Sequence, residues 1–283
     1  MTVVVPLPGA PRDHILTVLR ELEMKAAELQ QPRTNVDLYN SYVHWASSSA
    51  SRLGGLVTPA TRDALVTTRQ HWAILGLNDH SSQAAATVIR LEMDDRIRAL
   101  QAASIAFEYE MRRWENPAVR VVLDTSVYIK GDKLRDIVLA HHLGSRDAAV
   151  EILIPMVVLD ELDRLKEIKD PHVRFRAGYT LAVIENVLSG NPLRGQLKDM
   201  EPVPDEGDAR RGPIYLHLLY DPIGHQPLPV ADDEIIDRAL AAKVMAGGHV
   251  HLITYDTNMA FKARLNSLLA VKLGTQKETD PEP

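Results

Sequence analysis

The sequence predicts an α/β protein in which a parallel sheet flanked by helices follows an all-helical module. Three observations lead to this prediction. Apolar residues recur at helical spacing as far as Glu115, and Asn116-Pro117 then interrupt the pattern. Beyond that break, short runs rich in valine, isoleucine and leucine alternate with helical stretches, which is the order that produces a parallel sheet.

The helical module is predicted to span residues 1–116. Its apolar pattern is broken at Pro32, at Gly54-Gly55 and at Gly76, so we expect four helices, the third from Thr58 to Gly76 and the last from Ser81 to Glu115. Amphipathic helices of this kind pack as a small bundle. We expect the module to drive homo-oligomerisation or to dock a protein partner.

The second predicted domain covers residues 117–274. A proline- and glycine-rich stretch, 189–230, is expected to be an insertion with one strand near 214–220, and the charged tail 275–283 is expected to be disordered. The expected strands are 119–123, 150–155, 249–254 and 269–272, and the expected helices are 132–142, 156–170, 173–188, 231–246 and 258–267.

Composition excludes several classes of protein. The 283 residues include no cysteine, which rules out disulfides and thiolate metal sites and is compatible with a reducing cytoplasm, where we expect the protein to reside. No run approaches the ~20 apolar residues of a membrane helix, so no membrane association is expected. The net charge of −6 provides no overall basic surface for nucleic acid, and phosphate contacts would have to come from local clusters of cations.

Acidic residues stand at the ends of the predicted strands or at the starts of the helices that follow. Asp124 ends a valine-rich run, Glu161 lies one turn into the next helix, Asp232 and Asp233 open another helix, and Asp256 ends the strand HLITYD. These junctions meet at one edge of a parallel sheet. Carboxylates gathered there would repel one another unless cations occupied the site, and oxygen-only ligands favour Mg²⁺ or Mn²⁺.

Such a site suits phosphodiester hydrolysis, because a divalent ion activates water and stabilises the leaving oxygen. In a two-metal arrangement, Asp124 and Asp256 would be direct ligands, while Glu161 and Asp232 would bind a second ion or hold water on the first. Asp233 competes with Asp232 for its place. The neighbouring Thr125, Ser126 and Asn258 would orient phosphate or water.

The four acidic segments together resemble a known family. VVLDTSVYI, VVLDELDRLK, ADDEIIDRALA and LITYDTNMAFKA are similar, in order and spacing, to the four acidic motifs of PIN-domain nucleases, over about residues 118–273. The ELDRLK and DTN forms look more like the larger PIN domains than the minimal toxin ribonucleases. The helical half and the long 189–230 stretch depart from those toxins, which puts a toxin–antitoxin role in doubt.

This resemblance implies a Rossmann-like sheet and a metal-dependent endoribonuclease that acts on single-stranded or structured RNA. It also implies products with 5′-phosphate and 3′-hydroxyl ends. The site positions that carry over by motif are Asp124, Glu161, Asp232 (or Asp233) and Asp256.

A cluster of basic residues follows Glu161. Arg164, Lys166, Arg174 and Arg176 are predicted to bind RNA phosphates beside the metal site, and a mixed-charge surface offset by Glu167 and Asp170 is the competing interpretation.

Other interpretations stay open at the level of sequence. Asp124 alone would be expected to cap a turn or helix, and Glu161 also fits a solvated helix face. His249 and His251 share a strand face without a third ligand, so they are interpreted as ordinary strand residues. For the whole chain, the alternatives are a non-catalytic RNA-binding or scaffold protein that keeps the fold and a metal-dependent flap-type DNA nuclease.

Overall fold

The computed structural model describes residues 3–144, 147–202, 210–221 and 225–274. The chain divides into two compact units, Met1–Glu115 and Asn116–Pro283. The predicted disordered tail, 275–283, lies outside the described residues. None of the helices in the described part of the chain combines the length and the apolar character that a membrane span requires.

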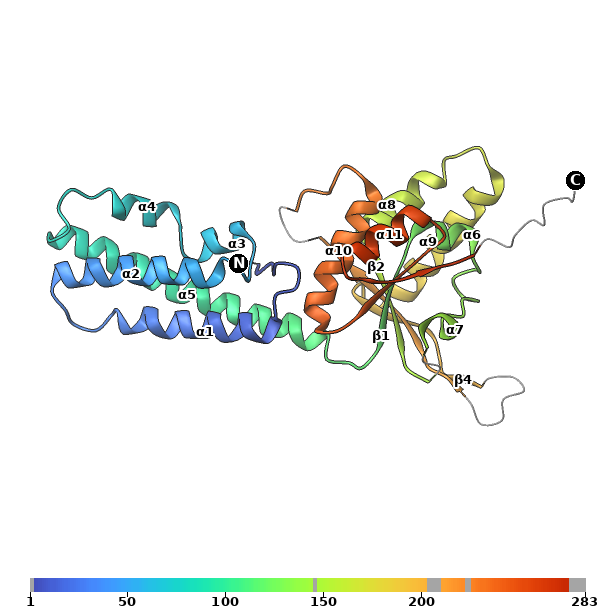
Figure 1. Cartoon of the computed structure of the whole chain (residues 1–283), viewed down its shortest axis with the longest axis horizontal. Coiled ribbons are helices and arrows are strands. Elements are labelled where there is room, and N and C mark those ends of the chain that lie inside the picture. Colours follow the sequence, from blue (N-terminus) through green and yellow to red (C-terminus); the bar gives the residue numbers. More distant parts are fainter. Residues whose placement is uncertain (1–2, 145–146, 203–209, 222–224, 275–283) are drawn as a thin grey trace, which may run out of the picture. The chain divides into compact units, whose positions relative to one another are not determined.

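The first unit is all-helical in its described part, as predicted. The long helix α5 is its centre, and each of the other four helices contacts it (Figure 1). Apolar side chains such as Leu19 and Leu100 are fully buried in this unit. The helices are α1 (Arg12–Glu28), α2 (Asn35–Leu53), α3 (Pro59–Leu65), α4 (Arg69–Leu75) and α5 (Gln83–Arg113).

The single helix predicted from Thr58 to Gly76 is wrong, because α3 and α4 are separate. Thr68 stands between them with extended backbone, and its hydroxyl accepts a hydrogen bond from the His71 amide at 3.1 Å as the N-cap of α4. The same hydroxyl donates to the buried Glu92 carboxylate at 2.8 Å. Apolar periodicity alone does not reveal this side-chain bond.

The second unit is built on a six-stranded sheet in the order β3-β6-β2-β1-β7-β8 (Figure 1). All neighbouring strands are parallel except β3 and β6, so the predicted Rossmann-like α/β fold is confirmed with one antiparallel edge strand. The strands are β1 (Val119–Leu123), β2 (Val150–Pro155), β3 (Arg194–Lys198), β6 (Ile214–Leu219), β7 (Val250–Thr254) and β8 (Leu269–Lys272).

In the described part of this unit, six helices accompany the sheet. α8 and α10 contact β2, α10 and α11 contact β7, and α9 contacts β3 and β6. β1 lies between β2 and β7, and its residues from Arg120 to Leu123 are buried. The helices are α6 (Thr125–Lys130), α7 (Ala140–Leu143), α8 (Met156–Leu165), α9 (Pro171–Leu188), α10 (Ala231–Ala246) and α11 (Thr257–Leu265).

The stretch predicted as an insertion, 189–230, is part of the main sheet. It supplies β6, which pairs with β2 in parallel, and the antiparallel edge strand β3. A small second sheet pairs β4 (Glu201–Pro202) with β5 (Arg210–Arg211). β6 coincides with the strand predicted near 214–220, whereas the edge strand β3, which its pairing with β6 stabilises, was not predicted.

The helix predicted at 132–142 is also wrong. α6 begins directly after Asp124 and ends at Lys130, and the backbone of the following Gly131 is extended. The guanidinium of Arg176 on α9 donates to the carbonyls of Tyr128 in α6 and of Gly131 and Asp132 beyond it, at 2.7 Å each, so these acceptors are satisfied without further helical turns. Only α7 is helical in the later part of this range.

A buried charge network crosses the sheet near the amino end of β2. Glu151 is 2% exposed, and its carboxylate accepts a hydrogen bond from Arg194 Nε at 2.9 Å. Arg120 Nε lies 3.3 Å from the same carboxylate, and His217 Nδ1 lies 3.3 Å from it. Burial acts to raise the pKa of Glu151, but His217, Arg194 and Arg120 outweigh it and hold the pKa below its usual value. β1, β2, β3 and β6 are therefore tied together by one carboxylate.

We predict that Glu151→Leu destabilises the C-terminal unit by about 3 kcal/mol, because it leaves the Arg120 guanidinium buried without this carboxylate. Urea unfolding followed by circular dichroism measures the effect as a lower midpoint. Glu185→Leu on the exposed face of α9 is the matched control. Equal midpoints for the two variants would contradict the assignment.

Candidate metal centre

Asp124 is a buried carboxylate at the carboxyl end of β1. It is 6% exposed, and its Oδ2 accepts hydrogen bonds from Ser126 Oγ at 2.5 Å and from Thr254 Oγ1 at 2.8 Å. It precedes α6, but its side chain makes no capping bond to that helix. The interpretation of Asp124 as a simple helix cap is therefore wrong.

Two hydroxyls join the ends of β1 and β7 around Asp124. Thr254, the last residue of β7, is fully buried, and its Oγ1 also accepts from the Asp256 amide at 2.8 Å. Ser126 Oγ accepts from the Tyr255 amide at 3.3 Å. Ser126, predicted to orient phosphate or water, here orients Asp124. Thr254 was not predicted, and its only signal in the sequence is a hydroxyl at the end of an apolar strand.

Glu161 on α8 faces the start of α6. It is half-buried, and its Oε2 accepts a hydrogen bond from the buried Thr125 Oγ1 at 2.5 Å. Burial raises the pKa of Glu161. The hydrogen bond from Thr125 lowers it, but the nearby carboxylates of Asp124 and Asp232 raise it further, and the net shift is upward. Glu161 is thus coupled to two other predicted acids and does not behave as a solvated helix residue. Thr125 orients Glu161 in this arrangement.

The structure separates Asp232 from Asp233 at the start of α10. Burial raises the pKa of Asp232, and the carboxylates of Asp124, Asp256 and Asp233 add to the rise. Asp233 instead pairs with Lys262 Nζ of α11 at 2.6 Å. Asp232 is therefore the member of the pair that faces the other acids.

Asp256 and Asn258 lie at the start of α11, and both are exposed. Asp256 Oδ1 accepts a hydrogen bond from the Met259 amide at 2.9 Å, so one of its oxygens caps the helix. Its charge raises the pKa of Asp232 and, with Asp233 and Asp232, that of Lys262. Lys262, which the sequence analysis missed, is a cation at the border of the acidic group. The only signal for it is its position six residues after Asp256.

The four acids fit a divalent cation by their chemistry. They offer only oxygen donors. Burial, and then their like charges, raise the pKa of two members, Glu161 and Asp232, and a bound cation would lower these pKa values. Their spacing is open. Among the described residues, three or more acidic or histidine ligand atoms lie within 4.8 Å of one another only at Asp221, His225 and Glu234. A wider set suits Mg²⁺ or Mn²⁺, because such ions keep part of their water.

The basic residues predicted to bind RNA differ in their surroundings. Arg164 and Arg174 are exposed, and Lys166 pairs with Asp163 at 2.7 Å. Arg176 is 6% exposed, and its guanidinium is bonded to the main-chain carbonyls of Tyr128 in α6 and of Gly131 and Asp132 after it. The prediction that Arg176 binds RNA is therefore wrong, because packing of α9 against α6 directs this side chain inward.

Comparison with protein-family models gives a match. A family model described as PIN domain matches residues 121–274, which is more than half of the chain. The matched range extends from β1 to just beyond β8 and contains every acid of the candidate site. No curated protein matches the chain.

The two neighbouring aspartates give a prediction for the metal-free protein. In EDTA at pH 8, Asp232→Asn is expected to raise the melting temperature by about 1–3 °C, because it removes a charge that neighbouring carboxylates repel. The raised pKa values of Asp232 and Glu161 mean that the folded state binds these protons more tightly than the unfolded state does. The repulsion is therefore present above their folded-state pKa, and the gain shrinks as the pH falls through it toward 4.

Asp233→Asn is the matched control. It loses the Lys262 ion pair and should give no stabilisation. Calorimetry from pH 4 to 8 measures both variants. An Asp232→Asn protein that melts no higher than wild type at pH 8 would remove Asp232 from the acidic group.

Proposed function

The chain belongs to the PIN-domain family, and we propose that it is a metal-dependent endoribonuclease that hydrolyses phosphodiester bonds of single-stranded or structured RNA. PIN domains are generally nucleases that use divalent metal ions, so the family supports a hydrolase role in broad terms. RNA as the substrate and Mg²⁺ or Mn²⁺ as the ion are the finer parts of the proposal.

The electrostatic coupling of four carboxylates at the carboxyl edge of the sheet is the observation that carries the proposal. Besides burial, the charges of Asp124 and Asp232 raise the pKa of Glu161, and those of Asp124 and Asp256 raise the pKa of Asp232. Asp124 directly follows β1, whereas the other acids come from α8, α10 and the start of α11, which are far from β1 in the chain. A scaffold or RNA-binding role would not need to gather mutually repelling charges in this place.

Each residue of the site has a task that its contacts support. Asp124 and Asp256 would hold the ion directly, with Asp124 fixed by the hydroxyls of Ser126 and Thr254. Glu161 and Asp232 would hold a second ion or its water, and Thr125 fixes Glu161. The bound Mg²⁺ or Mn²⁺ would supply Lewis-acid activation of water and positive charge for the leaving oxygen.

Cations on α8, α9 and α11 support a polyanionic substrate. Lys262 stands at its border, paired with Asp233, and Arg164 lies one turn after Glu161 on α8. Arg174 is exposed in the first turns of α9. These side chains would neutralise phosphates of the strand that enters the site, and Asn258 would orient a phosphate or water at the start of α11.

For the helical unit, we propose association with a second copy or with another protein. Support comes from large apolar side chains that are exposed on its helices. Leu91, Ile105 and Tyr109 of α5 are 58%, 62% and 65% exposed, and Trp72 of α4 is 62% exposed. Side chains of this kind are enriched at protein interfaces.

The activity is tested with the purified full-length chain, single-stranded RNA and Mn²⁺ or Mg²⁺. We expect cleavage to 5′-phosphate and 3′-hydroxyl ends, abolished by EDTA. Asp124→Asn and Asp256→Asn should each lower the rate by more than about 100-fold, because each removes a direct ligand. Asp233→Asn, which leaves the four acids intact, is the control for a local charge change.

Each result has a consequence. RNA binding without cleavage would support a non-catalytic role, and cleavage of flap DNA but not of RNA would support a DNA nuclease. If Asp124→Asn and Asp256→Asn cleave RNA like wild type, the assigned site is wrong.

Arg174 gives a separate prediction about substrate binding. Arg174→Ala should weaken RNA binding several-fold and reduce the salt dependence of the binding constant by about one phosphate contact. Fluorescence anisotropy at several salt concentrations measures this in the Asp124→Asn background, which prevents cleavage. Lys198→Ala is the control, because Lys198 Nζ donates to the main-chain carbonyl of Ile137. An unchanged salt slope for Arg174→Ala would exclude a phosphate contact.

A further inference from the structure

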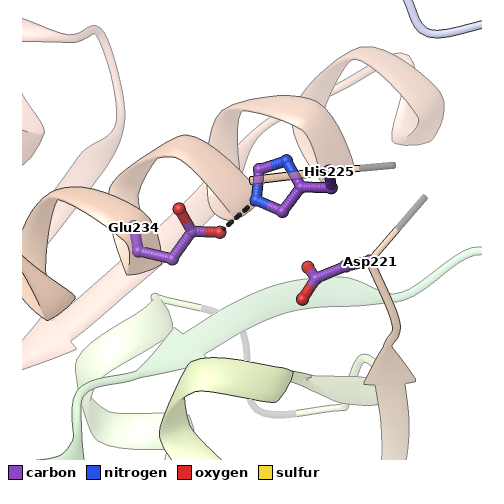
Figure 2. Close-up of side chains that lie close together, drawn as sticks. All are labelled: Asp221, His225 and Glu234. Carbon is purple, nitrogen blue, oxygen red and sulfur yellow. Dashed lines mark hydrogen bonds and ion pairs between the residues drawn. The ribbon is translucent and has the colours of Figure 1, made fainter. Parts of the chain in front are cut away.

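A second group of metal-ligating side chains lies outside the acidic site. Asp221 follows β6, His225 belongs to the segment before α10, and Glu234 lies in the first turn of α10 (Figure 2). One ligand atom from each residue lies within 4.8 Å of the other two. Glu234 follows Asp232 by two positions, and residues so spaced on a helix do not face the same way. The group therefore differs from the acidic site in its residues and in its direction.

The carboxylate of Glu234 is the centre of the group. It is 1% exposed, and its Oε1 lies 2.7 Å from His225 Nε2. Its Oε2 accepts a hydrogen bond from the Leu228 amide at 2.8 Å. Arg238 Nε, one turn further along α10, lies 3.3 Å from Oε1. A buried acid thus holds the segment before α10 to the helix.

Asp221 is the less satisfied member. Its Oδ1 is shielded from solvent and has no hydrogen-bond donor among the described residues, and Arg238 Nη1 is 3.9 Å away. In Figure 2 its carboxylate is drawn toward the space near the imidazole of His225. A buried carboxylate oxygen without a donor costs free energy unless a ligand binds it. Asp221 therefore indicates that the group lacks one positively charged partner.

The charges around Arg238 lead to the same conclusion. The carboxylates of Asp221, Glu234 and Asp237 share its single guanidinium, which leaves an excess of two negative charges with His225 counted as neutral. A cavity of about 200 Å³ is lined by Asp221 and Glu234 together with Asp160 and Arg164, whose opposite charges offset each other, and it has room for an ion with bound water. One divalent cation would neutralise the excess.

We infer that Asp221, His225 and Glu234 form a second metal site that takes Zn²⁺. Zinc is bound in proteins by imidazole nitrogen and carboxylate oxygen, and three protein ligands leave one position for water. The imidazole distinguishes this set from the oxygen-only acids, which suit Mg²⁺ or Mn²⁺. Zinc binding requires His225 to carry its ring proton on Nδ1. The lone pair of Nε2 then binds the ion, and Nε2 no longer forms a hydrogen bond with Glu234.

The ion would fasten the segment before α10 to the first turn of that helix. Asp232 belongs to the same turn, so the zinc site would help to hold one acid of the other site in place. The three zinc ligands take no part in the proposed hydrolysis. A protein that binds no zinc would therefore not contradict the proposed nuclease function, and a protein without nuclease activity would not contradict the zinc site.

Zinc binding is tested on the full-length protein after removal of metals. Zn²⁺ is titrated against a chromophoric chelator in excess Mg²⁺, which occupies the oxygen-only acids. We expect wild type to bind one Zn²⁺ and to gain melting temperature. His225→Gln and Asp221→Asn should bind it about 10- to 100-fold more weakly and lose the gain. His249→Gln, at an exposed histidine, and Asp124→Asn should bind like wild type.

Two outcomes would overturn the inference. One is a His225→Gln protein that binds Zn²⁺ with wild-type stoichiometry and affinity. The other is loss of the zinc equivalent in Asp124→Asn alone, which would place the ion at the oxygen-only acids. A melting curve without metal is the control for folding of His225→Gln. If this curve is cooperative, weak zinc binding by the variant reports the lost ligand.

Discussion

Repulsion between carboxylates at the carboxyl edge of the parallel sheet is the constraint on which the rest of the C-terminal unit depends. Asp124 ends the buried strand β1, and chain segments far apart in sequence bring Glu161, Asp232 and Asp256 to it. The protein supplies uncharged donors, the hydroxyls of Ser126 and Thr254, to the innermost acid. The nearby cation Lys262 is paired with Asp233. The positive charge that would balance the group is left to come from outside the chain.

At the amino end of the same sheet, a buried carboxylate is balanced by cations of the chain itself. Glu151 is more deeply buried than Asp124, and it is compensated within the chain by Arg194, Arg120 and His217. Burial of a paired carboxylate fixes the strands, whereas an acid without internal cations has affinity for an ion. The two ends of the sheet thus carry a structural charge and a candidate functional one. Arg176 is structural as well, because its guanidinium donates hydrogen bonds to the main-chain carbonyls of Tyr128, Gly131 and Asp132.

Much of the fold was predictable because it follows from local patterns. Short apolar runs identified β1 and β2, and helical periodicity identified α9 to within two residues of its start. The errors lie where a distant partner decides the conformation. Pairing with β6 makes the edge strand β3 within a stretch rich in breakers where only the strand at 214–220 was predicted, and bonds from Arg176 stop the chain after α6 from being helical. Glu92 likewise binds the threonine that separates α3 from α4.

By itself the sequence determined which acids stand at the strand ends, because chain order and strand position are local properties and a parallel sheet gathers such ends. It also determined the family, through four motifs in order. Only the tertiary structure decided between Asp232 and Asp233, placed Arg176 inside while Arg174 stays exposed, and identified Thr254 as the partner of Asp124. Adjacent residues on a helix point in different directions, and the packing of neighbouring elements decides which of them faces the site. The group of Asp221, His225 and Glu234 belongs with these, since no local spacing brings its three ligand atoms together.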